Sequence, residues 1–212
     1  MQLSRAVLTG LVLAMLPAAF AQRWEVGGGV GGGFYSSQTF TLPTGSADGG
    51  FSGGLAASVW VGQNYHASKL GGEIRYDYQQ NSMKLSSGSD KATFGGQSHA
   101  LHYDFLYHFA GQDAAIRPYI SAGAGVKLYR GTGKEQAFQP LHQFALLTEA
   151  DETTALGSVG AGAKFQLTDR ISMRLEIKDN FTPLPKSLLT PNVGVKVGGW
   201  IHDFVPMVGI TF

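Results

Sequence analysis

Residues 204–212 read Phe-Val-Pro-Met-Val-Gly-Ile-Thr-Phe, and this stretch decides the fold. Successive side chains of an extended strand point to opposite faces of the sheet. One face of this segment is therefore strongly apolar, and its residues are Phe204, Pro206, Val208, Ile210 and Phe212. A bare apolar strand is an unprotected sheet edge in a soluble protein. We therefore expect this strand to close a barrel, because a sheet that spans a bilayer must leave no open edge.

Seven further segments alternate in the same way, and each is about ten residues long, as a tilted strand that crosses the hydrocarbon layer must be. We expect these strands at residues 24–35, 53–63, 70–80, 97–109, 117–130, 156–167 and 171–179. Long connections, at 36–52, 81–96, 131–155 and 180–203, alternate with short ones. Outer-membrane barrels alternate short periplasmic turns with long external loops in this way. The sequence thus predicts an all-β fold, an eight-stranded antiparallel transmembrane up-and-down β-barrel.

The alternative fold is a soluble antiparallel barrel or sandwich, in which the apolar face points inward. Aromatic residues on the apolar face favour the membrane barrel, because such residues gather at the two membrane interfaces. They are Trp24, Phe34, Tyr78, Tyr103 and Phe109. The opposite face combines glycine with charges of both signs, which suits a narrow lumen better than a solvated surface.

Residues 1–21 have the features of a secretory signal peptide. Arg5 precedes the apolar run 6–16, and Ala19-Phe20-Ala21 forms an A-x-A cleavage pattern. The run is too short to span a bilayer. We therefore expect cleavage near Gln22 and one outer-membrane β-barrel domain over residues 22–212. The chain has no cysteine, which excludes disulfides and Cys-based metal sites, and its net charge of +1 gives no electrostatic case for nucleic acid as a partner.

Charged residues of both signs fall on the inward face of the predicted strands. The interior of an eight-stranded barrel is just filled by its own side chains, so these charges must pair with one another. We predict a lumen charge network, structural or pore-forming, of Glu25, Glu73, Arg75, Asp77, Asp104, Lys127, Lys164, Arg174, Glu176 and Lys178. The alternative is a narrow porin-like channel for ions or small solutes. Room for such a path comes from inward glycines at positions 27, 29, 31 and 33.

The signal, the eight alternating strands, the short-long connections and the C-terminal Phe212 together resemble the small OmpA/OmpX-type outer-membrane barrels, over essentially the whole mature chain. The resemblance implies residence in the outer membrane of a Gram-negative cell envelope, against its lipid and lipopolysaccharide. In that family the last strand is recognised by the barrel-assembly machinery, and the matching residues here are Val208, Ile210 and Phe212. The resemblance implies little about activity, because the fold hosts adhesins, anchors, narrow pores and lipid enzymes.

A lipid A-modifying enzyme is the third possible function. The lipid A deacylases combine a His, a Ser two residues on and an acidic residue on late strands. Here the His-x-Ser pattern occurs at His66-Ala67-Ser68, within a short turn, and no serine stands at that spacing from His202. A hydrolase needs its nucleophile and base within hydrogen-bond reach. We therefore expect no enzymatic activity, and we predict no catalytic, metal-binding or cofactor-binding residue and no cofactor.

The long loops are the expected place for any specific binding. Residues 140–147 are expected to form one or two turns of helix, and residues 182–191 are expected to be too proline-rich to extend the strands. The apolar side chains of the third and fourth long loops have two possible roles. They either dock a surface ligand or pack on each other as a lid over the barrel mouth.

Overall fold

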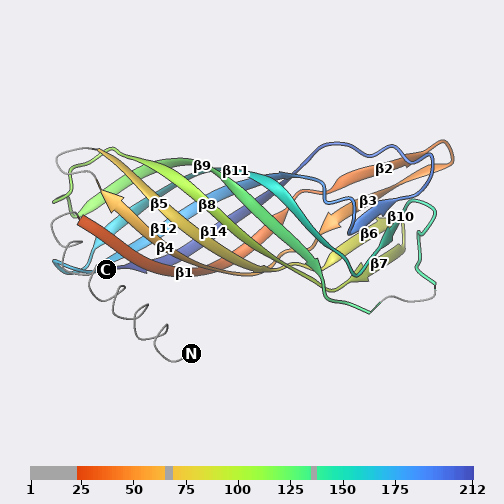
Figure 1. Ribbon diagram of the computed structural model, residues 1–212, viewed down its shortest axis with the longest axis horizontal. Helices are drawn as coiled ribbons and strands as arrows, with labels where there is room; N and C mark the ends of the chain where they lie inside the picture. The colour runs from red at the N-terminus through yellow and green to blue at the C-terminus, as the bar shows by residue number, and fades with distance from the viewer. Residues whose placement is uncertain (1–22, 65–68, 135–137) are drawn as a thin grey trace, which may run out of the picture.

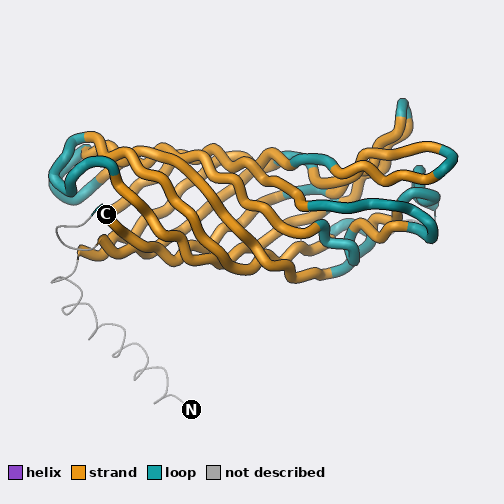
Figure 2. The backbone as a smooth tube through the Cα atoms, turned by 90° about the horizontal axis from the view of Figure 1, so that it is seen from above, coloured by secondary structure: helices purple, strands orange, loops and turns teal. Residues whose placement is uncertain are grey.

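The computed structural model describes residues 23–64, 69–134 and 138–212. Eight strands close into one antiparallel barrel, which forms the long cylinder in Figures 1 and 2. These strands are β1 (Arg23–Tyr35), β4 (Gly54–Asn64), β5 (Leu70–Gln80), β8 (Gly96–His108), β9 (Ile116–Gly131), β11 (Asp151–Gln166), β12 (Ser172–Pro183) and β14 (Trp200–Thr211). The predicted fold class is confirmed. The signal peptide predicted at residues 1–21 lies outside the described residues.

The two faces of the barrel wall are oriented as in a membrane protein. Large apolar side chains such as Phe34 (61% exposed) and Ile74 (58%) point outward along the strands. Charged side chains such as Arg75 and Arg174, each 1% exposed, point into the lumen. A soluble barrel would show the reverse arrangement. The wall therefore presents an apolar band to its surroundings and encloses its charges.

The first and last barrel strands close the cylinder. In the order around the barrel, β1 lies between β14 and β4. Phe212 exchanges two backbone hydrogen bonds with Val26, of 2.9 and 3.2 Å. The C-terminal strand therefore has partners on both sides, and the exposed edge that its sequence seemed to leave does not exist.

The long connections carry strands of their own at one end of the barrel, which we call the cap end. The opposite end, with the short turns, the start of β1 and the C-terminus, is the terminal end (Figure 1). A four-stranded sheet has the order β2-β3-β6-β7, and a two-stranded sheet pairs β10 with β13. Their bounds are β2 (Gln38–Leu42), β3 (Gly45–Phe51), β6 (Met83–Ser87), β7 (Asp90–Phe94), β10 (Ala145–Leu147) and β13 (Leu189–Pro191). These two sheets and the connections around them form the cap.

The cap has its own hydrophobic core. Its buried residues come from all four long connections and from the ends of the barrel strands, and they are Phe40, Ala47, Phe51, Met83, Leu85, Ala92, Phe94, Tyr129, Leu141, Phe144, Ala145, Leu147, Leu184, Leu188, Leu189 and Ile201. Phe51 stacks on Tyr129 of β9 with ring centroids 4.9 Å apart, which joins the cap core to the barrel wall. The loops thus pack on each other over the barrel mouth as one folded unit.

Two local predictions were wrong. Residues 140–147 form a turn followed by β10 and no helix, because Leu141 has a left-handed backbone (φ 64°) that a right-handed helix excludes. The side-chain amide of Gln139 instead pairs with both backbone groups of Leu147, at 2.8 and 3.0 Å. Strand β12 also extends into the proline-rich segment and ends at Pro183, which still pairs with Trp200 of β14.

No helix in the described part of the chain is long and apolar enough to cross a membrane.

Candidate functional site

The lumen holds the charged residues that the sequence singled out. All ten lie on the inner face of the barrel, and nine of them are buried, while Glu25 near the terminal end is half-buried. The structure brings them together in three layers along the barrel axis, which follow from the register of the strands. Each layer links strands that are not neighbours in the wall.

The middle layer is built on two arginines from opposite walls. Arg174 of β12 donates two parallel hydrogen bonds to the carboxylate of Glu73 on β5, of 2.7 and 2.9 Å. Arg75 of β5 donates in return to Glu176 of β12 at 2.5 Å, and Arg174 also pairs with Glu176. The forked guanidinium suits this bidentate contact, which fixes direction as well as distance. The four side chains therefore cross-link the barrel through its centre.

A second group in the middle layer centres on His102. Its Nδ1 lies 3.0 Å from Asp104 and its Nε2 lies 2.8 Å from Asp77. Ionised carboxylates only accept hydrogen bonds, so both ring nitrogens must donate and the ring is an imidazolium. Lys178 pairs with the other oxygen of Asp104, and Arg75 donates to Asp77 at 2.9 Å. Each carboxylate here therefore has two cationic partners.

The cap-end layer is centred on Lys127. Its ammonium group donates to Asp203 at 2.7 Å, to the Tyr35 hydroxyl at 2.9 Å and to Gln79 at 3.0 Å. All three hydrogens of the ammonium group therefore have acceptors. The Tyr35 hydroxyl also accepts a bond of 2.7 Å from Asn81, so the layer continues toward the cap.

The terminal-end layer pairs Lys164 with Glu25, and Asn64 donates to the same carboxylate. Arg117 lies beside them and donates to Asn64 at 3.4 Å. His108 is fully buried nearby. The charge network thus extends from the cap to the terminal end.

The space that the β1 glycines leave is occupied by side chains from the neighbouring strands. A Cβ atom on Gly27 would lie 2.5 Å from the Trp60 ring, and one on Gly29 would lie 3.1 Å from Met207. Trp60 in turn lies under both arginines of the middle layer, with centroid distances of 5.1 Å for Arg75 and 4.7 Å for Arg174. Such contacts stabilise a cation on a ring face. The glycines therefore accommodate Trp60 and Met207 and do not mark an open path.

Sequence reasoning missed several members of the network. Arg117 was left out because it lies at the first position of the predicted strand 117–130, and Asp203 because it falls within the predicted connection 180–203. Both follow the two-residue alternation of β9 and β14, which was the available signal. Tyr35 and Tyr119 lie on the inward face by the same alternation, but they were not predicted as partners because the predicted network was limited to charged side chains. Tyr119 donates to Glu176 at 2.6 Å.

The lumen holds nearly equal numbers of positive and negative side chains. Within the described residues, six carboxylates and six lysine or arginine side chains face the interior, and His102 adds a further positive charge. Pairing of this kind avoids the cost of an isolated buried charge. The same described residues contain no group of three or more His, Asp or Glu side chains placed to hold a metal ion.

The remaining predicted residues lie on the outer wall or outside the described chain. Val208, Ile210 and Phe212 point outward from the end of β14 and are exposed. His202 pairs through Nδ1 with Asp179 of β12 at 2.8 Å, whereas its neighbour Asp203 points into the lumen. The segment His66-Ala67-Ser68 lies outside the described residues.

Comparison with known proteins identifies the family. The family described as outer membrane protein beta-barrel domain matches residues 6–198, which is most of the chain. The chain belongs to this family. Membership indicates an outer-membrane location for a protein with this fold. A search of curated protein sequences found no match.

A solved structure shares the fold. The chain is similar to neisserial surface protein A with a TM-score of 0.55 and 14% identity, covering 89% of this chain and 95% of that one. Two further matches have TM-scores of 0.42. They are the N-terminal β-barrel domain of Pseudomonas aeruginosa OprF (16% identity, 90% and 98% covered) and Ail of Yersinia pestis (10% identity, 89% and 99% covered). Similarity at this level of identity concerns the fold alone.

Proposed function

We propose that this protein is a sealed outer-membrane barrel that holds a folded cap at the cell surface, where it acts as a structural or surface-interaction protein. The observation that carries the proposal is the layered ion-pair network of the lumen. The arginines of its middle layer join β5 to β12 through the centre of the barrel. An ion that passes this layer would have to separate them, and separating a buried pair leaves charge uncompensated at a cost of several kcal/mol.

This arrangement counts against the narrow channel as the physiological role. A conducting pore needs binding groups that an ion can enter and leave. The carboxylates of the middle layer are each held by two cationic partners, and Trp60 and Met207 fill the space beside the glycines. The lumen therefore acts as a plug that fixes the shape of the wall.

The surface of the cap supports a binding role. Three exposed apolar residues lie on the third and fourth long connections, namely Phe138 (69% exposed), Leu146 (42%) and Val193 (95%). The two connections are joined by the β10–β13 pair and by the hydrogen bond from Asn192 to the backbone of Phe144. Exposed apolar side chains on a packed unit are suitable contacts for a surface ligand.

Export and assembly are part of the same proposal. The N-terminal segment would direct export, and the exposed apolar face of β14 at Val208, Ile210 and Phe212 would present the recognition element for the barrel-assembly machinery. In the membrane the wall would contact outer-membrane lipid and lipopolysaccharide. The cap would then face outward, as long loops do in this class.

We propose no catalytic activity. His202 has an acidic partner in Asp179, but the hydroxyl of the adjacent Ser36 accepts a hydrogen bond of 2.9 Å from the backbone N–H of His202. The imidazole itself lies between the rings of Phe181 and Phe204, with centroid distances of 6.1 and 6.3 Å. This environment is typical of a side chain among the aromatic residues at a membrane interface, and it requires no hydrolytic role.

The absence of cysteine makes the surface display of the cap directly testable. Val193→Cys places a single thiol on the cap, and Gly111→Cys places one in a short turn at the terminal end. A maleimide that does not cross membranes should label Val193→Cys on intact cells. It should label Gly111→Cys only after the outer membrane is permeabilised. The opposite labelling pattern would contradict the proposal.

A further inference from the structure

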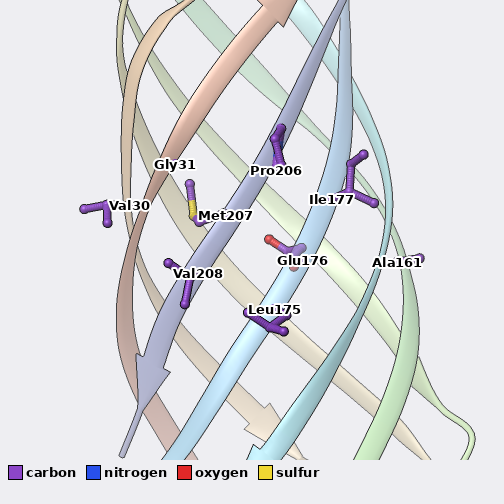
Figure 3. Close-up of a pocket in the computed structure, with 9 residues that line it drawn as sticks. All are labelled: Val30, Gly31, Ala161, Leu175, Glu176, Ile177, Pro206, Met207 and Val208. Carbon is purple, nitrogen blue, oxygen red and sulfur yellow. The ribbon is translucent and has the colours of Figure 1, made fainter.

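The outer wall of the barrel carries an apolar groove of about 520 Å³ where β1, β14, β12 and β11 lie side by side (Figure 3). Six residues line it from the outer face, and they are Val30, Ala161, Leu175, Ile177, Pro206 and Val208. None of these side chains carries a polar group. The groove is therefore a depression in the lipid-facing band, and its lining is as apolar as the rest of that band.

The register of the strands explains its shape. Ala161, Ile177 and Pro206 stand in one row across three strands, and Leu175, Val208 and Val30 stand in the next row. The first row begins and ends with small side chains, whereas the second row consists of branched ones. A shallow depression results, and the longer side chains form its walls.

Proline 206 also weakens the wall at this place. Val26 and Phe212 exchange both of their backbone hydrogen bonds. Every second residue pair along an antiparallel ladder is hydrogen-bonded in this way, and the register makes Gly32 and Pro206 such a pair. Pro206 has no N–H to donate there. The ladder between β1 and β14 is accordingly paired at Gly31–Met207 and again at Phe34–Phe204, with no pairing of Gly32 or Gly33 between them. The interrupted ladder lies at the groove.

Charge does not reach the groove from the lumen. Glu176 and Met207 contribute to its floor from the inner face of the wall (Figure 3). The carboxylate of Glu176 is engaged inside the barrel by Arg75 at 2.5 Å and by Tyr119 at 2.6 Å. An occupant of the groove therefore meets hydrocarbon side chains and a closed wall.

We propose that this groove is a specific seat for one acyl chain of a membrane lipid. It lies midway along β1, β12 and β14, at the level where the wall faces the hydrocarbon layer. Lipid headgroups are excluded from that depth, and the groove is continuous with the apolar band that lipid already covers. An unbranched acyl chain fits a depression that has small residues at its floor and branched residues at its walls. Close van der Waals contact with these side chains stabilises the acyl chain there.

Native mass spectrometry of the refolded full-length barrel tests this proposal, with dipalmitoyl phosphatidylethanolamine added to the detergent micelles as the probe. The wild-type barrel should retain one lipid. Ala161→Phe fills the groove and should lower the retained fraction about tenfold. Ala124→Phe is the matched control, because Ala124 is an exposed alanine on the outer face of β9 and pairs with Gly157 of β11, four residues along that strand from Ala161. Its retained fraction should equal that of the wild type.

Heat-dependent gel mobility establishes that each variant is folded, and Ala161→Leu serves as a smaller replacement if the phenylalanine variant does not fold. Equal lipid retention by wild type and groove variant overturns the proposal, as does equal loss in both variants. A wild-type dimer that Ala161→Phe converts to a monomer also overturns it, because the groove would then be an interface between two copies of the chain.

Discussion

Arg75 on β5 and Glu176 on β12 are 101 positions apart in the sequence and form an ion pair of 2.5 Å in the middle of the lumen. In the order around the barrel, β5 and β12 are four strands apart in either direction, so the pair joins opposite walls. Arg174 and Glu73 make the reciprocal contact between the same two strands. The network thus links opposite sides of the barrel directly, whereas the backbone hydrogen bonds of the wall link only adjacent strands.

Removing one member of this cross-link should strongly destabilise the barrel. Arg174→Met leaves Glu73 and Glu176 short of a buried cationic partner, which should lower the free energy of unfolding by about 3–5 kcal/mol. Urea titration of the refolded barrel, followed by tryptophan fluorescence, measures the change. Arg130→Met is the control, because Arg130 pairs with Asp151 at an exposed site and should change stability little. Equal effects of the two substitutions would show that the lumen network does not brace the wall.

Close packing of β1 against β14 requires glycine at position 31. A Cβ atom there would lie 2.1 Å from the backbone oxygen of Pro206, and backbone cannot move as a side chain can. Gly31→Ala should therefore lower the free energy of unfolding by about 1–3 kcal/mol through overpacking. Gly111→Ala, whose new Cβ meets nothing within 4 Å, should leave the urea midpoint unchanged. An unchanged midpoint for Gly31→Ala as well would mean that the two strands lie farther apart than described.

The cap should respond to core substitutions separately from the barrel. Leu188 is fully buried in the cap core, and Leu188→Ala should cost about 2–5 kcal/mol of packing there. Limited proteolysis of the refolded protein should then cut the long connections faster, while the barrel fragment keeps its heat-dependent gel mobility. Phe138→Ala removes an exposed ring and should leave the cleavage rate unchanged. Loss of the barrel itself in Leu188→Ala would show that cap and barrel fold as one unit.

Phe212 is expected to act during assembly in the cell. Phe212→Ala should reduce the amount of barrel in the outer membrane and increase degradation in the periplasm, while refolding of the purified chain into micelles remains efficient. Phe109→Ala removes another exposed aromatic ring near the terminal end and serves as the control. If both variants reach the membrane as the wild type does, the end of β14 is not the recognition element.

The barrel and its inward charges could be predicted from sequence because a two-residue period is a local signal. It gave the direction of Arg75 and Glu176 without any knowledge of their partners. The period could not supply those partners, because the contact between β5 and β12 depends on how the three strands between them on each side curve the wall. The same limit explains why Asp203 was assigned to a loop when it is the acceptor for Lys127.

The cap was harder to predict because its strands are short. Segments such as Thr39-Phe40-Thr41-Leu42 alternate over only a few residues, and a hairpin of that length is stable only when it packs on something else. That packing comes from Leu141, Leu188 and other residues of distant connections, which no local pattern relates to one another. The predicted helix at 140–147 was wrong because the bond between Gln139 and Leu147 favours a strand-like turn.

Single-barrel conductance in a planar lipid bilayer tests the sealed lumen most directly. The wild-type protein should insert without discrete current steps at either polarity, because the arginine–glutamate pairs of the middle layer close the path. Steady current steps from the wild type would contradict the sealed lumen. A change in the size of those steps in Arg75→Ala would show that ions pass through the middle layer itself.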